Sequence, residues 1–386
     1  MLNDSLALLS DYPFDRLRAL LDGIEPPAGP TVVMSIGEPQ HSAPPILADI
    51  LAANADQWGR YPPSNGTVAF RTAVVEWLTR RFGLPATFLD PERHVLPVAG
   101  TREALYMIAQ VALPEHKGGN RPCVLLPNPF YQVYYGAAVM NHGQPVFVQD
   151  FTQAAPHVLE QTALAYVCTP ANPEGTVASL DTLKQAVMLA RHHGFVLAVD
   201  ECYSEIYDRD PPPGALQACA ELGHDLSNVI VFHSLSKRSS VPGLRSGFVA
   251  GDPRIISAFA RLRAYGGAAT PLPVLTAATA LWRDEAHVDS SRSLYRAKID
   301  AAERILGGKF DFRRPAGSFF LWLNVGDGEL AAKALWREAG IRVLPGAYLA
   351  QAGENRINPG HPFIRVALVH DLGTTITALQ RIHDIL

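Results

Sequence analysis

Short apolar runs alternate with longer amphipathic stretches between residue 44 and about residue 275. The amphipathic stretches are 12–17 residues long and their spacing predicts helices, among them 66–82, 102–113 and 180–193. The apolar runs predict strands, and they include 123–126, 164–168, 195–199, 229–232 and 247–250. Uniformly apolar strands that alternate with helices are typical of a parallel sheet covered on both faces. The pattern therefore predicts a large α/β domain over residues 44–275 with a mostly parallel sheet.

The two ends of the chain have different patterns from this middle part. Residues 1–43 are rich in turn-forming residues and contain one predicted strand, 31–36, so we expect an arm that contributes to a smaller domain and covers an active site. After Pro273 helical spacing continues to about Leu306. Beyond it the pattern predicts strands at 319–323 and 363–368, and helices at 329–339 and at the end of the chain. This mixture predicts a smaller α+β domain over residues 276–386.

Composition and charge narrow the classes of protein. Hydrophobic residues make up 48% of the 386 residues and charged residues 18%, which is typical of a folded globular protein. The formal net charge of −4 argues against nucleic-acid binding, because a phosphate polymer is held by positive charge. The chain has no basic leader and no long uncharged apolar run, so we expect a soluble cytoplasmic protein that contacts no membrane.

The sequence lacks the motifs of several common metal-binding and nucleotide-binding sites. The four cysteines, Cys123, Cys168, Cys202 and Cys219, do not have CxxC spacing, so we expect free thiols in a reducing compartment and no metal. The phosphate-binding loops GxxxxGK[ST] and GxGxxG are also absent from the sequence, which argues against an NTPase and a Rossmann dehydrogenase.

Reactive side chains follow three of the predicted strands. They are Asn172 after strand 164–168, Asp200 and Tyr203 after strand 195–199, and Ser234 and Lys237 after strand 229–232. Ligands of open α/β sheets bind beyond the carboxyl ends of the strands, so we expect these side chains to meet at one site.

These residues and Arg245 have a spacing that resembles a known signature. The separations from Asn172 through Asp200, Tyr203, Ser234 and Lys237 to Arg245 are 28, 3, 31, 3 and 8 residues. They resemble those of the fold type I pyridoxal-phosphate aminotransferases, and the resemblance spans nearly the whole chain. It implies pyridoxal 5′-phosphate as cofactor, with Lys237 as the catalytic lysine that forms a Schiff base and moves the substrate proton.

The same resemblance assigns the other positions. It implies that Asp200 keeps the ring nitrogen protonated, that Asn172 and Tyr203 bind the ring hydroxyl, and that Ser234 and Arg245 bind the phosphate. Further matches are Gly100, Thr101 and Arg102 in the phosphate cup, Tyr131 stacked on the ring, and Tyr61 on the partner subunit's phosphate, which implies a homodimer with shared sites. The backbone of Gly37 and the side chain of Arg365 match positions that bind the substrate α-carboxylate.

Each of these residues also has an ordinary structural alternative when it is taken alone. A lysine or aspartate after a strand is most often a solvated loop residue or a helix cap, and Tyr61 and Tyr131 can be packing aromatics. Arg365 is harder to explain in this way, because a buried guanidinium without a partner is costly. We interpret His192 and His193 as structural residues at the end of a predicted helix.

Longer segments indicate a subtype. Residues 11–17, 35–39, 127–131, 200–207 and 234–239 resemble bacterial succinyldiaminopimelate aminotransferases. This implies amino-group exchange between glutamate/2-oxoglutarate and an N-succinylated 2-amino-6-keto-pimelate, a step of lysine biosynthesis. Glu174 departs from the family pattern, which commonly has Thr or Ser there. The alternatives are an aspartate or aromatic aminotransferase, a C–S β-lyase on the same scaffold, and, more distantly, a non-enzymatic regulator.

A substrate with a distal carboxylate needs a second cation besides Arg365. Arg102 is our candidate, because its side chain at the first turn of helix 102–113 can extend toward the substrate. The alternative is that Arg102 only adds charge near the phosphate or points to solvent. Arg238, Arg261 and Arg263 are its competitors.

Overall fold

A seven-stranded sheet forms the centre of the computed structural model, which describes residues 2–353 and 356–386. The strand order is β2-β8-β7-β6-β5-β3-β4. The bounds are β2 Val95–Val98, β3 Cys123–Pro127, β4 Gln144–Val148, β5 Thr162–Cys168, β6 Val196–Asp200, β7 Val229–Ser234 and β8 Gly247–Gly251. Neighbours from β4 through β7 pair in parallel, which confirms the predicted α/β class with a mostly parallel sheet.

Strand β8 is the exception to the parallel arrangement. It pairs antiparallel with both β7 and β2. Between β7 and β8 the chain forms only a four-residue helix, α9 (Leu235–Arg238), and a short 3₁₀ turn, Pro242–Leu244. After this short connection β8 runs back beside β7 in the opposite direction. A parallel crossover needs a longer connection over one face of the sheet. An apolar run such as 247–250 does not reveal this direction.

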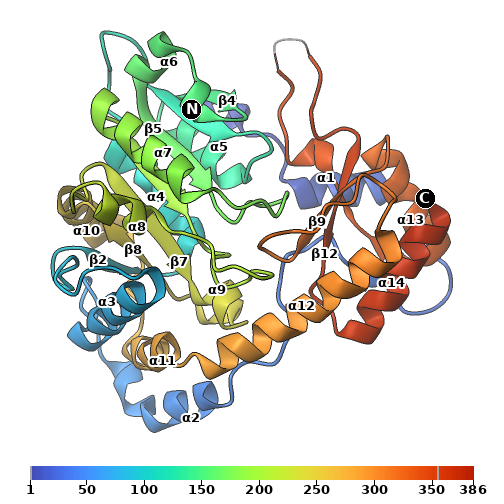
Figure 1. Cartoon of the computed structure of the whole chain (residues 1–386), viewed down its shortest axis with the longest axis horizontal. Helices are drawn as coiled ribbons and strands as arrows, with labels where there is room; N and C mark the ends of the chain where they lie inside the picture. Colours follow the sequence, from blue (N-terminus) through green and yellow to red (C-terminus); the bar gives the residue numbers. More distant parts are fainter. Residues whose placement is uncertain (1, 354–355) are drawn as a thin grey trace.

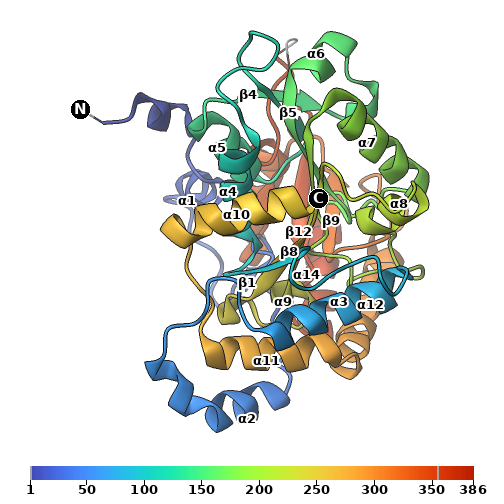
Figure 2. The same ribbon diagram turned by 90° about the vertical axis from the view of Figure 1, so that its left-hand side faces the viewer.

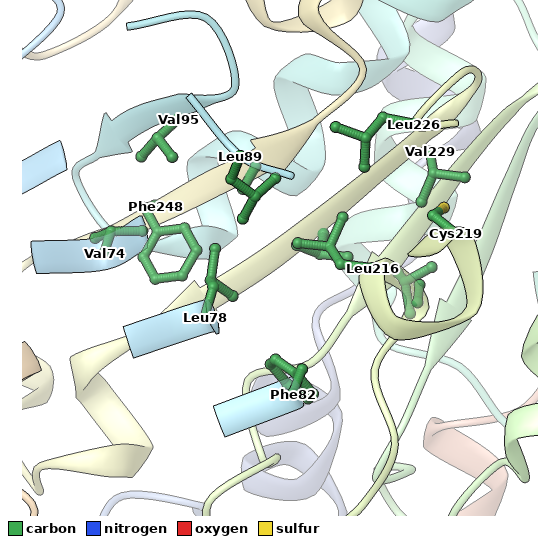
Figure 3. Close-up of a cluster of buried hydrophobic side chains, with 14 of the residues drawn as sticks. Val74, Leu78, Phe82, Leu89, Val95, Leu216, Cys219, Leu226, Val229 and Phe248 are labelled. Carbon is green, nitrogen blue, oxygen red and sulfur yellow. The ribbon is translucent and has the colours of Figure 1, made fainter. Parts of the chain in front are cut away.

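Helices cover both faces of the seven-stranded sheet, as the sequence predicts (Figures 1 and 2). One face packs against α4 (Thr101–Ala112), α5 (Gln132–Met140) and α10 (Pro253–Gly266). The other face packs against α3 (Val68–Phe82), α7 (Leu180–His193), α8 (Ala215–Glu221) and α11 (Leu272–Arg283). Figure 3 shows part of this second core, where Leu78 and Phe82 of α3 lie near Phe248 and Leu216. Short helices α2 (Ile46–Ala53) and α6 (Pro156–Gln161) complete this unit.

A smaller unit holds the C-terminal part of the chain. Its antiparallel sheet has the order β11-β12-β9, with bounds Leu344–Pro345, Phe363–Ala367 and Phe320–Asn324. Helices α13 (Gly328–Ala339) and α14 (Leu372–Ile385) pack on it together with the end of α12 (Ala286–Leu306). The chain therefore forms a second, α+β core beside the large sheet (Figure 1).

The N-terminal arm contacts both units: the Leu8 carbonyl accepts a hydrogen bond from the Tyr135 hydroxyl of α5, whereas the arm from α1 onward packs on the smaller unit. Helix α1 (Pro13–Leu21) packs near α13, and β1 (Val32–Val33) pairs in parallel with β10 (Ile341–Arg342). The predicted strand 31–36 is wrong in length, because only two residues form a strand. Beyond Val33 the chain stays against β12 of the smaller unit, where the Met34 carbonyl accepts a hydrogen bond from the backbone N–H of Ala367 and the Ser35 carbonyl accepts one from the Arg365 side chain.

The junction between the two units lies along α12. The predicted domain boundary at residue 275 falls within α11, which packs on α3 of the larger unit. Helix α12 then runs from this corner to the smaller unit, where Ile299, Ala302 and Leu306 enter its core (Figure 1). The division into three segments stays a prediction. Among the described residues, no helix has both the length and the apolar character needed to cross a membrane.

Candidate active site

A cavity of about 540 Å³ lies at the carboxyl ends of β5, β6 and β7, where the two units meet. It collects most of the residues singled out in the sequence: Gly37, Thr101, Arg102, Tyr131, Asn172, Asp200, Tyr203, Ser234, Lys237, Arg245 and Arg365. Gly100 lies next to this lining, directly before Thr101. Tyr61 does not line the cavity, and its side chain is fully exposed in the single chain.

Asp200 lies at the end of β6 and is buried. Its Oδ2 accepts a hydrogen bond from the Tyr134 hydroxyl at 2.7 Å, and its Oδ1 accepts one from the backbone N–H of Cys202 at 3.1 Å. Burial raises the pKa of this carboxyl above its ordinary value. Because both donors are neutral, the carboxylate fits a cationic partner such as a protonated ring nitrogen.

Lys237 lies on α9, a one-turn helix that Ser234 caps through the backbone N–H of Ser236. The lysine Nζ donates a hydrogen bond to the carbonyl of Gly37, which belongs to the N-terminal arm. Burial lowers the pKa of this amine to about 8. The amine therefore loses its proton far more readily than an ordinary lysine, as a nucleophile or general base requires.

An anion cradle lies at the N-terminus of α4. Gly100 has φ +86°, and a Cβ there would approach Arg245 Nη2 to 2.1 Å, so this position requires glycine. Arg245 donates to the carbonyls of Ala99 at 3.1 Å and Pro242 at 2.7 Å. The guanidinium and the free N–H groups of the first helical turn therefore lie together, a combination that suits a phosphate.

Arg365 presents a second cationic group on β12. It is buried, and it donates to Asn172 Oδ1 at 3.0 Å and to the Ser35 carbonyl at 2.7 Å. Its Nε has no hydrogen-bond partner among the described residues. Burial lowers the pKa of this guanidinium to about 10. A buried guanidinium with neutral partners and an unused donor is ready for a carboxylate.

The Arg102 side chain lines the cavity and contacts two tyrosines. Its Nε donates to the Tyr131 hydroxyl at 2.8 Å, and its Nη2 donates to the Tyr12 hydroxyl at 3.4 Å. The competing arginines are engaged elsewhere or lie outside the lining: Arg238 pairs with Glu285, Arg263 pairs with Glu103, and Arg261 does not line this cavity. Arg102 and Arg365 are thus two cations of one cavity.

The structure adds residues that sequence reasoning missed. They are Tyr12, Tyr134, Ser236 and Cys202, all of which line the cavity. Ser236 lies inside the Ser-Leu-Ser-Lys segment and Tyr12 inside the segment 11–17, so both signals were present in the sequence. The contact of Tyr134 with Asp200 joins residues 66 positions apart and leaves no local signal.

Tyr203 and Glu174 are two further positions considered in the sequence. Tyr203 is buried against Phe319 and Phe320, with ring centroids 5.5 and 5.8 Å away. Glu174 lies on the loop of Asn172, and burial raises the pKa of its carboxyl to about 7. The four cysteines are free thiols, as expected.

This architecture and cavity define a class of enzyme, and the comparisons agree. The family model described as aminotransferase class I and II matches residues 30–371. The chain belongs to this family, whose members use pyridoxal 5′-phosphate, and it is a transaminase. Asp200, Lys237 and the cradle at Gly100 fit such a cofactor.

Individual relatives cover nearly the whole chain. The chain is 34% identical over 362 residues to the 4-dedimethylamino-4-oxo-anhydrotetracycline transaminase OxyQ of Streptomyces rimosus, with 90% of this chain and 94% of the relative covered. It is 28% identical over 399 residues to the LL-diaminopimelate aminotransferase of Desulforudis audaxviator, with 98% and 96% covered. A crystal structure of an aminotransferase from Neisseria meningitidis matches with a TM-score of 0.94 and 41% identity, over 99% of each chain.

Proposed function

We propose that this transaminase exchanges an amino group between glutamate/2-oxoglutarate and an N-succinylated 2-amino-6-keto-pimelate, as in lysine biosynthesis. The observation that carries the proposal is the presence of Arg102 and Arg365 in one cavity. Both substrates have an α-carboxylate and a distal carboxylate, so each needs two cationic partners. The names of relatives that are LL-diaminopimelate aminotransferases support a substrate of this length and polarity.

In this proposal the cofactor is held by the residues around the cavity. Asp200 would pair with the ring nitrogen, Asn172 and Tyr203 would bind the ring hydroxyl, and Tyr131 would pack on the ring; all four line the cavity. The phosphate would be held at the N-terminus of α4 by Ser234, by Arg245 and by the backbone N–H groups of Gly100, Thr101 and Arg102. When bound, pyridoxal phosphate supplies an aldehyde that links to amines and a ring that accepts electrons from the substrate carbanion.

The other steps are performed by the chain itself. Arg365 and the backbone of Gly37 bind the α-carboxylate, which fixes the substrate Cα near Lys237. The Lys237 amine takes the proton from Cα as general base and later returns it as general acid. Its low pKa, about 8, matches both roles near neutral pH. Amino-group transfer through two half-reactions predicts ping-pong kinetics.

We also propose a homodimer with shared active sites. Tyr61 is fully exposed in the single chain, and the exposed Trp58 and Val68 lie close to it in sequence. An exposed aromatic group of this size is suited to a subunit interface. In such a dimer the Tyr61 hydroxyl would help to hold the cofactor phosphate of the partner subunit.

A panel of amino donors with 2-oxoglutarate tests the proposed substrate. We expect the highest kcat/KM for N-succinyl-LL-2,6-diaminopimelate, with lower values for aspartate and aromatic amino acids. A clear preference for an aromatic donor would contradict the proposal. A C–S β-lyase would release keto acid without any 2-oxoglutarate, so omission of the acceptor separates that alternative.

A further inference from the structure

A serine, a histidine and an aspartate form a hydrogen-bonded relay outside the cavity. His287, in the first turn of α12, places its Nδ1 2.6 Å from Asp284 Oδ2 and its Nε2 2.8 Å from Ser239 Oγ. An ionised carboxylate only accepts hydrogen bonds, so Nδ1 carries the proton. Burial lowers the pKa of the imidazole, which keeps it neutral, and its Nε2 therefore accepts a hydrogen bond from the Ser239 hydroxyl.

The hydrogen bonds from serine to histidine to aspartate are those of a hydrolase triad, but the serine is not accessible to a substrate. In such triads a serine attacks a substrate while a histidine, oriented by a carboxylate, takes its proton. Ser239 is only 1% exposed, so no substrate reaches its oxygen. The three side chains therefore have a role within the fold. Ser239 is the C-cap of α9, the helix that carries Lys237, so this role concerns the position of that helix.

The residue between Lys237 and Ser239 is anchored at the same corner. The Arg238 guanidinium is buried and donates to the Leu281 carbonyl at 2.6 Å and to Glu285 Oε1 at 2.9 Å. It also lies over the Trp282 ring, 4.9 Å from its centroid. The two residues that follow Lys237 thus contact the corner formed by the end of α11 and the start of α12.

This corner is where α12 leaves the larger unit for the smaller one. The far end of α12 lies in the core that also contains strand β12, which carries Arg365. The lysine that moves the proton and the arginine that binds the α-carboxylate are therefore connected through one helix.

We propose that Ser239, His287 and Asp284 are positioning residues that hold the Lys237 helix in register with α12, which keeps the lysine amine aligned with the substrate Cα. This inference rests on the proposed role of Lys237. The Ser239 segment contacts the Lys237 helix directly, whereas Arg365 is reached only through the whole length of α12, so we expect loss of the relay to change kcat more than KM.

Ser239→Ala in the holoenzyme tests the relay, with Ser239→Thr as the conservative variant. The matched control is Ser293→Ala, which removes an exposed hydroxyl of α12 that donates to the Asp289 carbonyl. We expect Ser239→Ala to lower kcat about tenfold while KM for glutamate stays within about twofold, because one hydrogen bond to the relay is lost. Ser239→Thr should restore most of kcat, and Ser293→Ala should behave as the parent.

A second variant keeps the shape of the relay and removes its charge. Asn at position 284 can still accept from His287 and cap α12, so Asp284→Asn should fold and lower kcat less than Ser239→Ala does. If both variants had a lower melting temperature but the kcat and KM of the parent, the three residues would only stabilise the fold, and the proposed positioning role would be wrong.

Borohydride labelling of the same samples separates the two proposals. If the label is on Lys237 and kcat of Ser239→Ala is unchanged, the proposed function stands and the positioning role of the relay is wrong. Label on another lysine overturns both.

Discussion

The hydroxyl of Tyr134 donates a hydrogen bond to Oδ2 of Asp200 over 2.7 Å, and both side chains are buried. The Tyr134 ring is stacked on Tyr166 at 4.5 Å between centroids, and the Tyr166 hydroxyl donates to the Leu105 carbonyl. Two aromatic rings and α4 thus fix the donor that faces the carboxylate. A hydrogen bond to the charged form favours ionisation, so Tyr134 opposes the effect of burial on the pKa of Asp200.

Tyr134→Phe should therefore raise the pKa of Asp200. The loss of a donor to a charged group costs about 1.5–3 kcal/mol, which corresponds to about one to two pKa units. We expect the acid limb of the kcat–pH profile to move to higher pH by about one to two units, with the loss of kcat confined to that limb. Tyr166→Phe is the control, because its hydroxyl does not contact Asp200. Identical profiles for the two variants would show that Tyr134 only fills space.

The position of the cofactor linkage gives a direct check of Lys237. The amine lies in the cavity with its pKa lowered by burial, whereas Lys298 is buried elsewhere against His41. We expect borohydride to fix a pyridoxyl group on Lys237, as read by mass spectrometry of peptides. Lys237→Ala should bind the cofactor and turn over very slowly, because no other lysine among the described residues lines the cavity. A pyridoxyl group on Lys184 or Lys298 would contradict the assignment.

Much of the fold was predictable because its signals are local. Helix α7 occupies 180–193 as predicted, since Ser179 caps its start and Gly194 ends it in the left-handed conformation. The residues after β5, β6 and β7 meet at one edge because parallel strands end on the same side. Chain direction alone thus placed Asn172, Asp200 and Lys237 in one cavity.

Other features depend on contacts between distant segments, which no local pattern encodes. The direction of β8 follows from a short connection and not from its apolar residues. The hydroxyl of Tyr134 and the side chain of His287 acquire their roles only through partners 66 and 48 positions away. The place of Tyr61 depends on a second chain, so it stays a prediction.

Burial of Lys237 should make the cofactor-free protein less stable at neutral pH. Its pKa falls from 10.5 to about 8 on folding, so between these values the unfolded chain binds more protons than the folded one. Stability from this group therefore rises with pH across that window, and the penalty below pH 8 is at most about 3 kcal/mol. The Lys237 side chain is only partly buried, which reduces this penalty.

Lys237→Met removes this penalty. We expect the free energy of unfolding of the cofactor-free variant to exceed that of the parent by about 2–3 kcal/mol at pH 7, and the gain to shrink by most of that amount at pH 10. Chemical denaturation at the two pH values measures it. Lys333→Met, on α13 and outside the cavity lining, is the control for the exchange of lysine for methionine itself. A gain for Lys237→Met that is equal at both pH values would refute the role of charge burial.

Subunit complementation tests the shared site proposed for Tyr61. Tyr61→Ala and Lys237→Ala should each be nearly inactive. In a hybrid dimer one site carries both lesions and the other carries neither, so random exchange should regenerate about a quarter of the parent activity. Exchange is verified by native mass spectrometry of tagged subunits. If exchange is complete and activity stays at the level of the separate variants, each site is built within one chain.

Substrate choice provides the test of Arg102. Its guanidinium donates to the Tyr131 and Tyr12 hydroxyls through Nε and Nη2, and among the described residues Nη1 has no hydrogen-bond partner, so this terminal amino group can bind a carboxylate. A charge-assisted contact of this kind contributes about 1.5–3 kcal/mol, or about one to two decades in kcat/KM. Arg102→Gln should lower kcat/KM for glutamate and for the succinylated donor by this factor. Alanine has no distal carboxylate, so its kcat/KM should change little. Arg261→Gln, outside the cavity lining, is the control and should leave all three values as in the parent. Equal losses for the three donors in Arg102→Gln would mean that Arg102 serves the cofactor phosphate and that another group selects the substrate.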